Sequence, residues 1–407
     1  MKTFHLMSAI FSAVLIFASH AVAQELDPEK LLAEPKGYVG SDVCKTCHLE
    51  HYDAWKRTLH SKMLQDVNVN ADVFVTDIIE SEVRADLAKK ESKLKVPSKD
   101  IHVPKMEDVK YTIGSQWKQR YLVEKEGELY IAPTQFNIDS GTWTNYHEAD
   151  WDKRPWMLKC GGCHATGVDL EKKSFVEPGV GCEACHGPGS HHAALPADET
   201  YQKRATIVNP SKLTGGVMTQ ICGSCHNRGK STQVKGAGWP VGYKPGKALE
   251  KYYKSIATGD KHLYSNDYSK GHHQQYLDWK RSKHADSGID CVTCHTVHEL
   301  GNPLFSSKTR VQGDALCTSC HVQTAKTGAH QVHSFGNCAN CHMPRIAKSA
   351  ESGDIRSHVF DVLLPQEAAD LGIPSSCNTC HQHKDADPVK LQEKWDRLTS
   401  REAITAN

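Results

Sequence analysis

The chain has 407 residues and a net charge of +1 with histidines neutral, and hydrophobic residues make up 39% of it. A balanced charge argues against the basic surface that nucleic-acid binding requires. The apolar fraction is small for a core of this size, which indicates that something other than side chains fills part of the interior.

The first residues predict a cleaved export signal that is not part of the fold. Lys2 gives a weakly basic start, residues 4–17 are largely apolar, and Ala21-Val22-Ala23 supplies the small residues that a signal peptidase requires. We therefore expect residues 1–23 to be a signal peptide. No later run is long and apolar enough to span a bilayer, so the mature chain is expected to be periplasmic or secreted.

Every cysteine belongs to a Cys-x-x-Cys pair that is followed at once by histidine, and this pattern occurs eight times. It is the attachment signature of c-type haem, in which the thiols add to the vinyl groups and the histidine becomes the proximal iron ligand. A zinc site or a redox dithiol shares the cysteine spacing but does not need the histidine. We therefore expect eight covalently attached haems c. Motifs 1 to 8 are Cys44-Cys47-His48, Cys160-Cys163-His164, Cys182-Cys185-His186, Cys222-Cys225-His226, Cys291-Cys294-His295, Cys317-Cys320-His321, Cys338-Cys341-His342 and Cys377-Cys380-His381.

Residues 24–150 are expected to form an N-terminal region that contains motif 1. Within it, residues 73–94 have apolar side chains at helical spacing and predict an amphipathic helix. Residues 121–123 and 129–131 alternate in the manner of strands on either side of Gly127, so we predict a β-hairpin there.

The other motifs divide the rest of the chain. They define a cluster of three haems at 151–230, a connecting segment at 231–290 and a C-terminal region of four haems at 291–407. At the end of the chain, Asp387 caps and Pro388 begins a predicted helix. Haems in this number can form the core themselves. The expected fold is a multihaem cytochrome c, mainly α and irregular around a haem-packed core, with a small β-hairpin between the first and second haems.

The second axial ligand of each iron is expected to be another histidine. Of the 25 histidines, eight are in the motifs and two precede residue 24, which leaves 15, whereas the chain has only seven methionines. Bis-histidine ligation gives lower reduction potentials than His/Met ligation. His102 and His262 lie in charged surroundings and are expected at the surface. The candidate distal ligands are His60, His147, His192, His273, His284, His298, His333 and His358, with a one-residue ambiguity at His191-His192 and at His272-His273.

Several segments resemble the multihaem cytochromes that share the haem-binding module of the tetrahaem cytochrome c-554 of nitrifying bacteria. Residues 38–60 (YVGSDVCKTCHLEHYDAWKRTLH) are similar to the opening of that module, in which the histidine that ends the aromatic helix is a distal ligand. Residues 180–192 (VGCEACHGPGSHH) resemble its second signature, in which the histidine after Gly-Pro-Gly is a distal ligand. The resemblance implies these roles for His60 and His192. It extends over most of the mature chain and says little about the redox partner.

The pattern favours an electron carrier with no catalytic residues of its own. With both axial positions filled, closely spaced haems pass electrons between redox partner proteins. In anaerobic respiration these partners include a quinol-oxidising membrane cytochrome, a terminal reductase or an outer-membrane conduit.

Two alternatives stay open. One is an octahaem reductase of a nitrogen or sulfur compound such as nitrite, hydroxylamine or tetrathionate, with one iron open or ligated by lysine. The chain lacks the Cys-x-x-Cys-Lys motif of octahaem nitrite reductases. Octahaem tetrathionate reductase-like enzymes take their lysine from elsewhere in the chain, and Lys153, Lys159 and Lys235 are conceivable here. The other alternative is assembly into an oligomer or haem filament.

Overall fold

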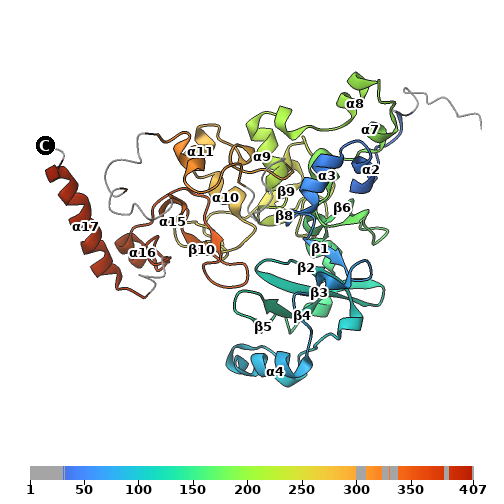
Figure 1. The fold of residues 1–407 in the computed structure, drawn as a ribbon. Helices are drawn as coiled ribbons and strands as arrows, with labels where there is room; N and C mark the ends of the chain where they lie inside the picture. The colour runs from blue at the N-terminus through green and yellow to red at the C-terminus, as the bar shows by residue number, and fades with distance from the viewer. Residues whose placement is uncertain are drawn as a thin grey trace, which may run out of the picture. The chain divides into compact units, whose positions relative to one another are not determined.

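The structure is a computed structural model. It describes residues 31, 33–298, 309–322, 330, 338–379 and 385–405, apart from the side chains of 398 and 400–405. The predicted signal peptide, 1–23, lies outside these residues. The chain divides into two units, Met1–Pro35 and Lys36–Asn407, and the second contains the fold described below (Figure 1). Within the described part, no helix is long and apolar enough to cross a membrane.

A five-stranded antiparallel sheet lies between motifs 1 and 2 in the chain, and each strand pairs with the next one in sequence. Strands β3 and β4 turn at Glu126 and Gly127, where φ is 55° and 74°, at the predicted position. The β3–β4 register shifts between Arg120 and Leu122, opposite the part of β4 that contains Pro133, which has no N–H to donate. The strands are β1 (Leu64–Asp66), β2 (Val109–Ile113), β3 (Lys118–Lys125), β4 (Glu128–Asn137) and β5 (Thr142–Asn145).

The prediction of a mainly α fold with one small hairpin was only partly right. The described residues form a mixture of helices and strands, and the hairpin is part of a five-stranded sheet. The prediction missed β1 and β5 because strands of three and four residues are too short to show a period-two pattern.

Helix α4 (Glu80–Ala88) covers one face of the sheet. Successive side chains of a strand point to opposite faces, and Tyr121 of β3 packs with the buried Val83 and Leu87 of α4. The helix is shorter than the predicted 73–94. The cause is the side chain of Gln119, which accepts from the backbone N–H of Val75 at 3.0 Å and donates to a backbone carbonyl two residues earlier, so that this segment stays extended.

The opposite face of the sheet packs against motif 2. Leu122 of β3 and Ile131 of β4 form a second buried cluster with Trp156, and Cys160 packs against this cluster. The sheet therefore supports motif 2 on one face and α4 on the other.

Helix α17 begins as predicted. The Asp387 carboxylate accepts from the backbone N–H of Lys390 at 3.1 Å, which is how an N-cap residue satisfies a free amide. Pro388 is the first helical residue, and Leu391 is buried. Helix α17 (Pro388–Thr405) contacts α16 (Pro365–Leu371).

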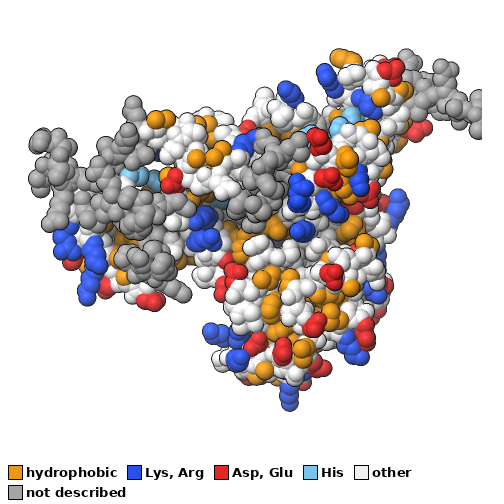
Figure 2. Space-filling model, viewed as in Figure 1, with side chains coloured by type: hydrophobic (Ala, Val, Ile, Leu, Met, Phe, Trp, Pro, Cys, Tyr) orange, Lys and Arg blue, Asp and Glu red, His pale blue; other side chains and the backbone are white. Residues whose placement is uncertain are grey.

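The remaining elements are short. On the face shown in Figure 2, acidic and basic side chains are interspersed, and histidines reach the surface near α2 and α7. The α-helices are α2 (Ser41–Lys45), α3 (Leu49–Lys56), α5 (Gly162–His164), α6 (Cys182–His186), α7 (Ser190–Ala194), α8 (Thr200–Thr206), α9 (Gly215–Gly223), α10 (Gln275–Trp279), α11 (Lys283–Asp286), α12 (Cys291–Cys294), α13 (Ala315–Thr318) and α15 (Cys338–His342). The 3-10 turns are η1 (Ala71–Val73), η2 (Glu91–Lys93), η3 (Ser98–Asp100), η4 (Met106–Asp108), η5 (Trp151–Lys153), η7 (Pro210–Lys212) and η8 (Leu249–Lys251), and η6 (Met157–Gly161) is a π-helical turn. Three small ladders pair β6 (Ala165–Thr166) with β7 (Glu177–Pro178), β8 (Gly229–Ser231) with β9 (Tyr253–Ser255), and β10 (Arg345–Ala347) with β11 (Ile355–Arg356).

Candidate haem sites

The motifs form single helical turns that bring their cysteines and histidine together. In motifs 1, 4, 5 and 6 the histidine N–H donates to the carbonyl of the first cysteine, four residues earlier, at 2.9 Å. The cysteines of motifs 1 to 6 form no disulfides, so their thiols are available for attachment. Within the described ranges, no group of three or more His, Cys, Asp or Glu side chains is arranged to hold a metal ion. Cys380 and His381 of motif 8 lie outside the described residues.

Six motif histidines face a second histidine across a gap that fits one iron. With metal–nitrogen bonds of about 2 Å, and about 1 Å from each nitrogen to its ring centroid, two imidazoles on one metal have centroids roughly 6 Å apart. The residues present therefore fit an iron between each pair. The centroid distances are 6.3 Å for His48–His192, 6.3 Å for His226–His60, 6.2 Å for His186–His298, 6.2 Å for His295–His358, 6.0 Å for His321–His284 and 6.2 Å for His342–His330.

Five of the eight predicted distal histidines stand in these pairs. His330, which the sequence analysis did not select, faces His342, while the selected His333 lies outside the described residues. His147 contacts the ring of Tyr146 at 4.6 Å and lies 3.5 Å from Asp150. Within the described part, no motif histidine is in ring contact with it. Its positive φ of 50° places it in the turn after β5, which directs the ring toward Asp150.

The rings of His191 and His192 make different contacts. His192 faces His48, and its Nδ1 lies 2.8 Å from the Lys203 carbonyl. His186 makes the same kind of contact, with Nδ1 2.7 Å from the Val208 carbonyl. A hydrogen bond at Nδ1 fixes the tautomer and turns Nε2 toward the gap between the paired rings. His191 is only 2% exposed, and among the described residues neither of its ring nitrogens has a hydrogen-bond partner.

Burial keeps paired histidines in the neutral form that binds metals. It lowers the pKa of His60 to about 4, and the neighbouring His226 acts in the same direction. Burial also lowers the pKa of His358 to about 4, assisted by His295. At neutral pH these imidazoles therefore carry no proton that competes with an iron.

Thiols of different motifs lie against one another, and their contacts give an order of neighbouring motifs. The thiol of Cys185 in motif 3 interacts electrostatically with both thiols of motif 4, and the thiol of Cys294 in motif 5 with both thiols of motif 6. The motifs therefore adjoin in the order 1, 3, 4, 5, 6, 7, and motif 2 branches from motif 4. The side-chain contacts are Cys44 with Cys182, Cys163 with Cys225, Cys222 with Cys291, and Cys317 with Cys338.

The buried Glu183 and the half-buried Glu177 join motifs 1 and 3. The Glu183 carboxylate, 1% exposed, accepts from the backbone N–H groups of Val39, Gly40 and Gly189 at 2.7–3.0 Å. The Ser41 hydroxyl donates to Glu177 at 2.7 Å and accepts from the N–H of the first cysteine of motif 3. Charge-assisted bonds of this kind are stronger than neutral ones, so they hold the two motifs together.

His164 of motif 2 has a different environment. Among the described residues, no histidine ring faces it at the paired distance, and its Nδ1 has no hydrogen-bond partner. Burial, together with the positive charges of Arg120 and Lys118, lowers its pKa to about 4. His273, another of the candidate distal ligands, has a pKa lowered by burial, by Arg228 and by His164, but it makes no ring contact with His164.

The conceivable lysine ligands named from the sequence lie elsewhere. Lys159 donates to the Gly236 carbonyl at 2.9 Å, Lys153 lies in η5 and Lys235 is exposed. The sequence analysis did not select Lys118 or Arg120. Lys118, Arg120 and Leu122 are at every second position of β3, so their side chains are expected on the same face of the sheet. This alternation could have indicated that the two cations point toward motif 2, as Leu122 does.

Adding a methyl group at Gly162 of motif 2 is expected to destabilise the protein by about 1–3 kcal/mol, the usual effect of overpacking. A Cβ there would lie 2.1 Å from the Trp239 ring, whose Nε1 is held by the Met157 carbonyl. Gly161→Ala is the matched control, because its Cβ meets side-chain atoms only at 3.5 Å or more. Chemical denaturation of the haem-loaded variants measures the difference. Equal stability of the two variants would show that Trp239 moves freely.

Parts of the chain are similar to known proteins. The profile of the family "Cytochrome c554 and c-prime" matches residues 43–112 and 140–187, which include motifs 1, 2 and 3. The chain is 23% identical over 232 residues to the multiheme cytochrome MtrA of Shewanella baltica, covering 55% of this chain and 47% of that protein. It is 26% identical over 195 residues to the dissimilatory sulfite reductase MccA of Wolinella succinogenes, covering 42% and 23%. The chain thus spans less than half the length of these two curated relatives.

The fold has a counterpart among solved structures. The outer cell wall cytochrome OcwA aligns with 88% of this chain and 86% of its own chain, with a TM-score of 0.70 and 24% identity. The motifs, the paired histidines and these matches together define a protein that binds haem c. The chain is a multihaem c-type cytochrome.

Proposed function

We propose that this cytochrome is an exported octahaem protein that conducts electrons between redox partners in anaerobic respiration. The proposed proximal ligands are the eight motif histidines, and six of them have the distal partners His60, His192, His284, His298, His330 and His358. Bound haem supplies the redox couple, and its potential depends on axial ligands and burial. At the six paired sites the two histidines would both hold the iron, which leaves no ligand position for a substrate there, and the protein also holds the motifs close together.

The observation that carries the proposal is the set of six histidine pairs, each separated by the distance that one iron requires. The continuous order of neighbouring motifs supports conduction. The proposed location outside the cytoplasmic membrane rests on the export signal predicted at 1–23 and on covalent attachment through thiols.

Electron paramagnetic resonance of the oxidised holoprotein tests this function, and the intact mass gives the number of attached haems. We expect eight haems, with low-spin ferric signals from at least the six paired sites. Three or more high-spin irons among the eight in the resting protein would contradict the proposal, because at least one of the six paired sites would then have an open ligand position.

A second function is favoured by the environment of motif 2. Lys118 acts electrostatically on His164, and burial lowers the pKa of Lys118 to about 6, while its amine donates to the Ser349 carbonyl, a bond that ligation would have to break. A neutral amine is the form of lysine that binds a metal. We therefore propose, as the alternative, a reductase of a small nitrogen or sulfur compound at this site, with Lys118 as an exchangeable ligand.

Turnover with sulfite, nitrite, hydroxylamine and tetrathionate distinguishes the two functions. Sulfite is included because MccA, a relative over part of the chain, is named a sulfite reductase. A reductase is expected to lose turnover of its substrate in Lys118→Met, while the six paired sites keep their low-spin signals. Absence of turnover with all four compounds would remove this alternative.

A further inference from the structure

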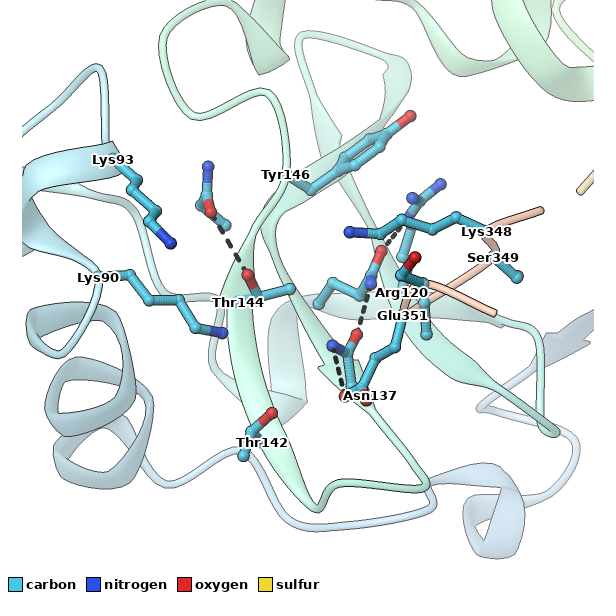
Figure 3. A pocket seen from close by; sticks show the side chains of 14 residues that line it. Lys90, Lys93, Arg120, Asn137, Thr142, Thr144, Tyr146, Lys348, Ser349 and Glu351 are labelled. Carbon is cyan, nitrogen blue, oxygen red and sulfur yellow. Dashed lines mark hydrogen bonds between the residues drawn. The ribbon is translucent and has the colours of Figure 1, made fainter. Parts of the chain in front are cut away.

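A cationic cavity opens beside motif 2, between the sheet and the loop at 348–352. It has a volume of about 520 Å³ and is lined by Lys90, Lys93, Arg120 and Lys348, with Glu351 as the one acidic residue. Figure 3 shows Lys90 and Lys93 extending from one side and Lys348 from the other, toward the strand that carries Thr142 and Thr144. The excess of positive charge indicates a site for an anion.

Arg120 is the most unusual cation in this cavity. Its Nε donates to the Gln135 side chain at 2.7 Å, and its guanidinium carbon lies 3.6 Å from the Tyr146 ring centroid. Among the described residues, it has no carboxylate within ion-pair distance, and its two terminal NH2 groups have no hydrogen-bond partner. A half-buried cation without a counter-ion is costly. The free edge of the guanidinium has the fork geometry that binds two oxygens of one anion.

The acidic groups around the cavity are held by other partners. The Asp354 carboxylate accepts from the backbone N–H groups of Ser349, Ala350 and Glu351 at 2.5–3.0 Å. Glu351 accepts from the Asn137 side chain at 3.4 Å. Neither carboxylate forms an ion pair with a cavity cation within the described part of the chain, so the positive charge of the cavity is available to an anionic ligand.

The cavity also lies next to motif 2. Tyr146 lines both this cavity and a small neighbouring one that Cys160 lines as well. The charge of Arg120 acts on both Cys160 and His164. An anion held at Arg120 therefore sits where it alters the electrostatic potential at the haem of motif 2.

We propose that the cavity binds a compact oxyanion, with Arg120 as its anchor and Lys93 and Lys348 at its rim. The oxyanion has two sources, a free anion from solution or a propionate of the haem attached at motif 2. The shared chemistry is a pair of oxygens on the Arg120 guanidinium. The site does not depend on the protein being a conductor or a reductase.

Inorganic phosphate is the probe, and isothermal titration calorimetry of the holoprotein is the measurement. For a free anion, we expect one phosphate per chain and binding weaker by about tenfold or more in Arg120→Gln, the loss typical of charged hydrogen bonds. Lys348→Gln removes a rim charge without changing the half-buried Arg120, and a smaller loss is expected. Arg84→Gln is the matched control, because Arg84 is paired with Glu80 outside the cavity.

Spectroelectrochemistry separates the two sources. If wild type binds no phosphate, but Arg120→Gln changes the pH dependence of one haem's potential, as a propionate released from its guanidinium would, and Arg84→Gln does not, the oxyanion is the haem's own propionate. Phosphate binding that survives both Arg120→Gln and Lys348→Gln would overturn the proposal. Absence of both phosphate binding and any potential shift in Arg120→Gln would overturn it as well.

Discussion

Replacing His192 by alanine is expected to convert one low-spin ferric iron per molecule to the high-spin state, whereas replacing His191 is expected to convert none. His192 faces His48 at a centroid distance of 6.3 Å, with its Nδ1 held by the Lys203 carbonyl. Removal of that imidazole leaves the iron of motif 1 with His48 alone. An iron that loses an axial nitrogen takes a weaker ligand or none, which favours the high-spin state.

His191→Ala is a demanding control because His191 is the adjacent residue and is 2% exposed. A general disturbance of α7 would affect both variants. Quantitative electron paramagnetic resonance of the two oxidised proteins gives the number of high-spin irons in each. A high-spin signal from His191→Ala and none from His192→Ala would reverse the assignment.

Local patterns in the sequence predicted the elements that depend on nearby residues. The start of α17 followed from Asp387 and Pro388, and the β3–β4 turn followed from Gly127 between alternating residues. The motif turns followed from the Cys-x-x-Cys-His spacing itself. In each case the residues that determine the geometry are within about one or two turns of one another.

The histidine pairs show why the rest was not predictable. His60 faces His226 and His298 faces His186, more than 100 residues away in each case. No periodicity connects such residues, so the sequence analysis relied on the surroundings of each histidine and selected His147. Six motif histidines nevertheless have a histidine partner, in agreement with the excess of histidines over motifs.

The region of Lys118 and Arg120 was missed for a different reason. Both residues lie on a strand that was predicted only as half of a hairpin, and no role was predicted for either of them. In the fold, their face of β3 is the one that packs against motif 2. A charged residue on the same strand face as core residues is expected to be buried and therefore to have a specific role. This inference can be made only when it is known what packs against that face.

Removal of the attachment site at motif 4 is expected to abolish conduction through the protein, whereas removal of motif 2 is expected to preserve it. The thiols of motif 4 adjoin those of motif 2 and motif 5 directly and lie within electrostatic range of motif 3. Motif 4 thus connects the two ends of the order 1, 3, 4, 5, 6, 7, and motif 2 is a side branch. Cys222→Ser with Cys225→Ser removes the connection, and Cys160→Ser with Cys163→Ser removes only the branch.

Current through single molecules bridged between two electrodes measures this difference. Tyr201→Cys in α8 and Val389→Cys in α17 provide tethers, because these side chains are 83% and 52% exposed. The motif 4 variant is expected to conduct no better than the haem-free chain, and the motif 2 variant nearly as well as wild type. Each variant lacks one attachment site, so loss of a haem is common to both. Equal loss of current in the two would show that the order of adjoining thiols is not the order of conduction.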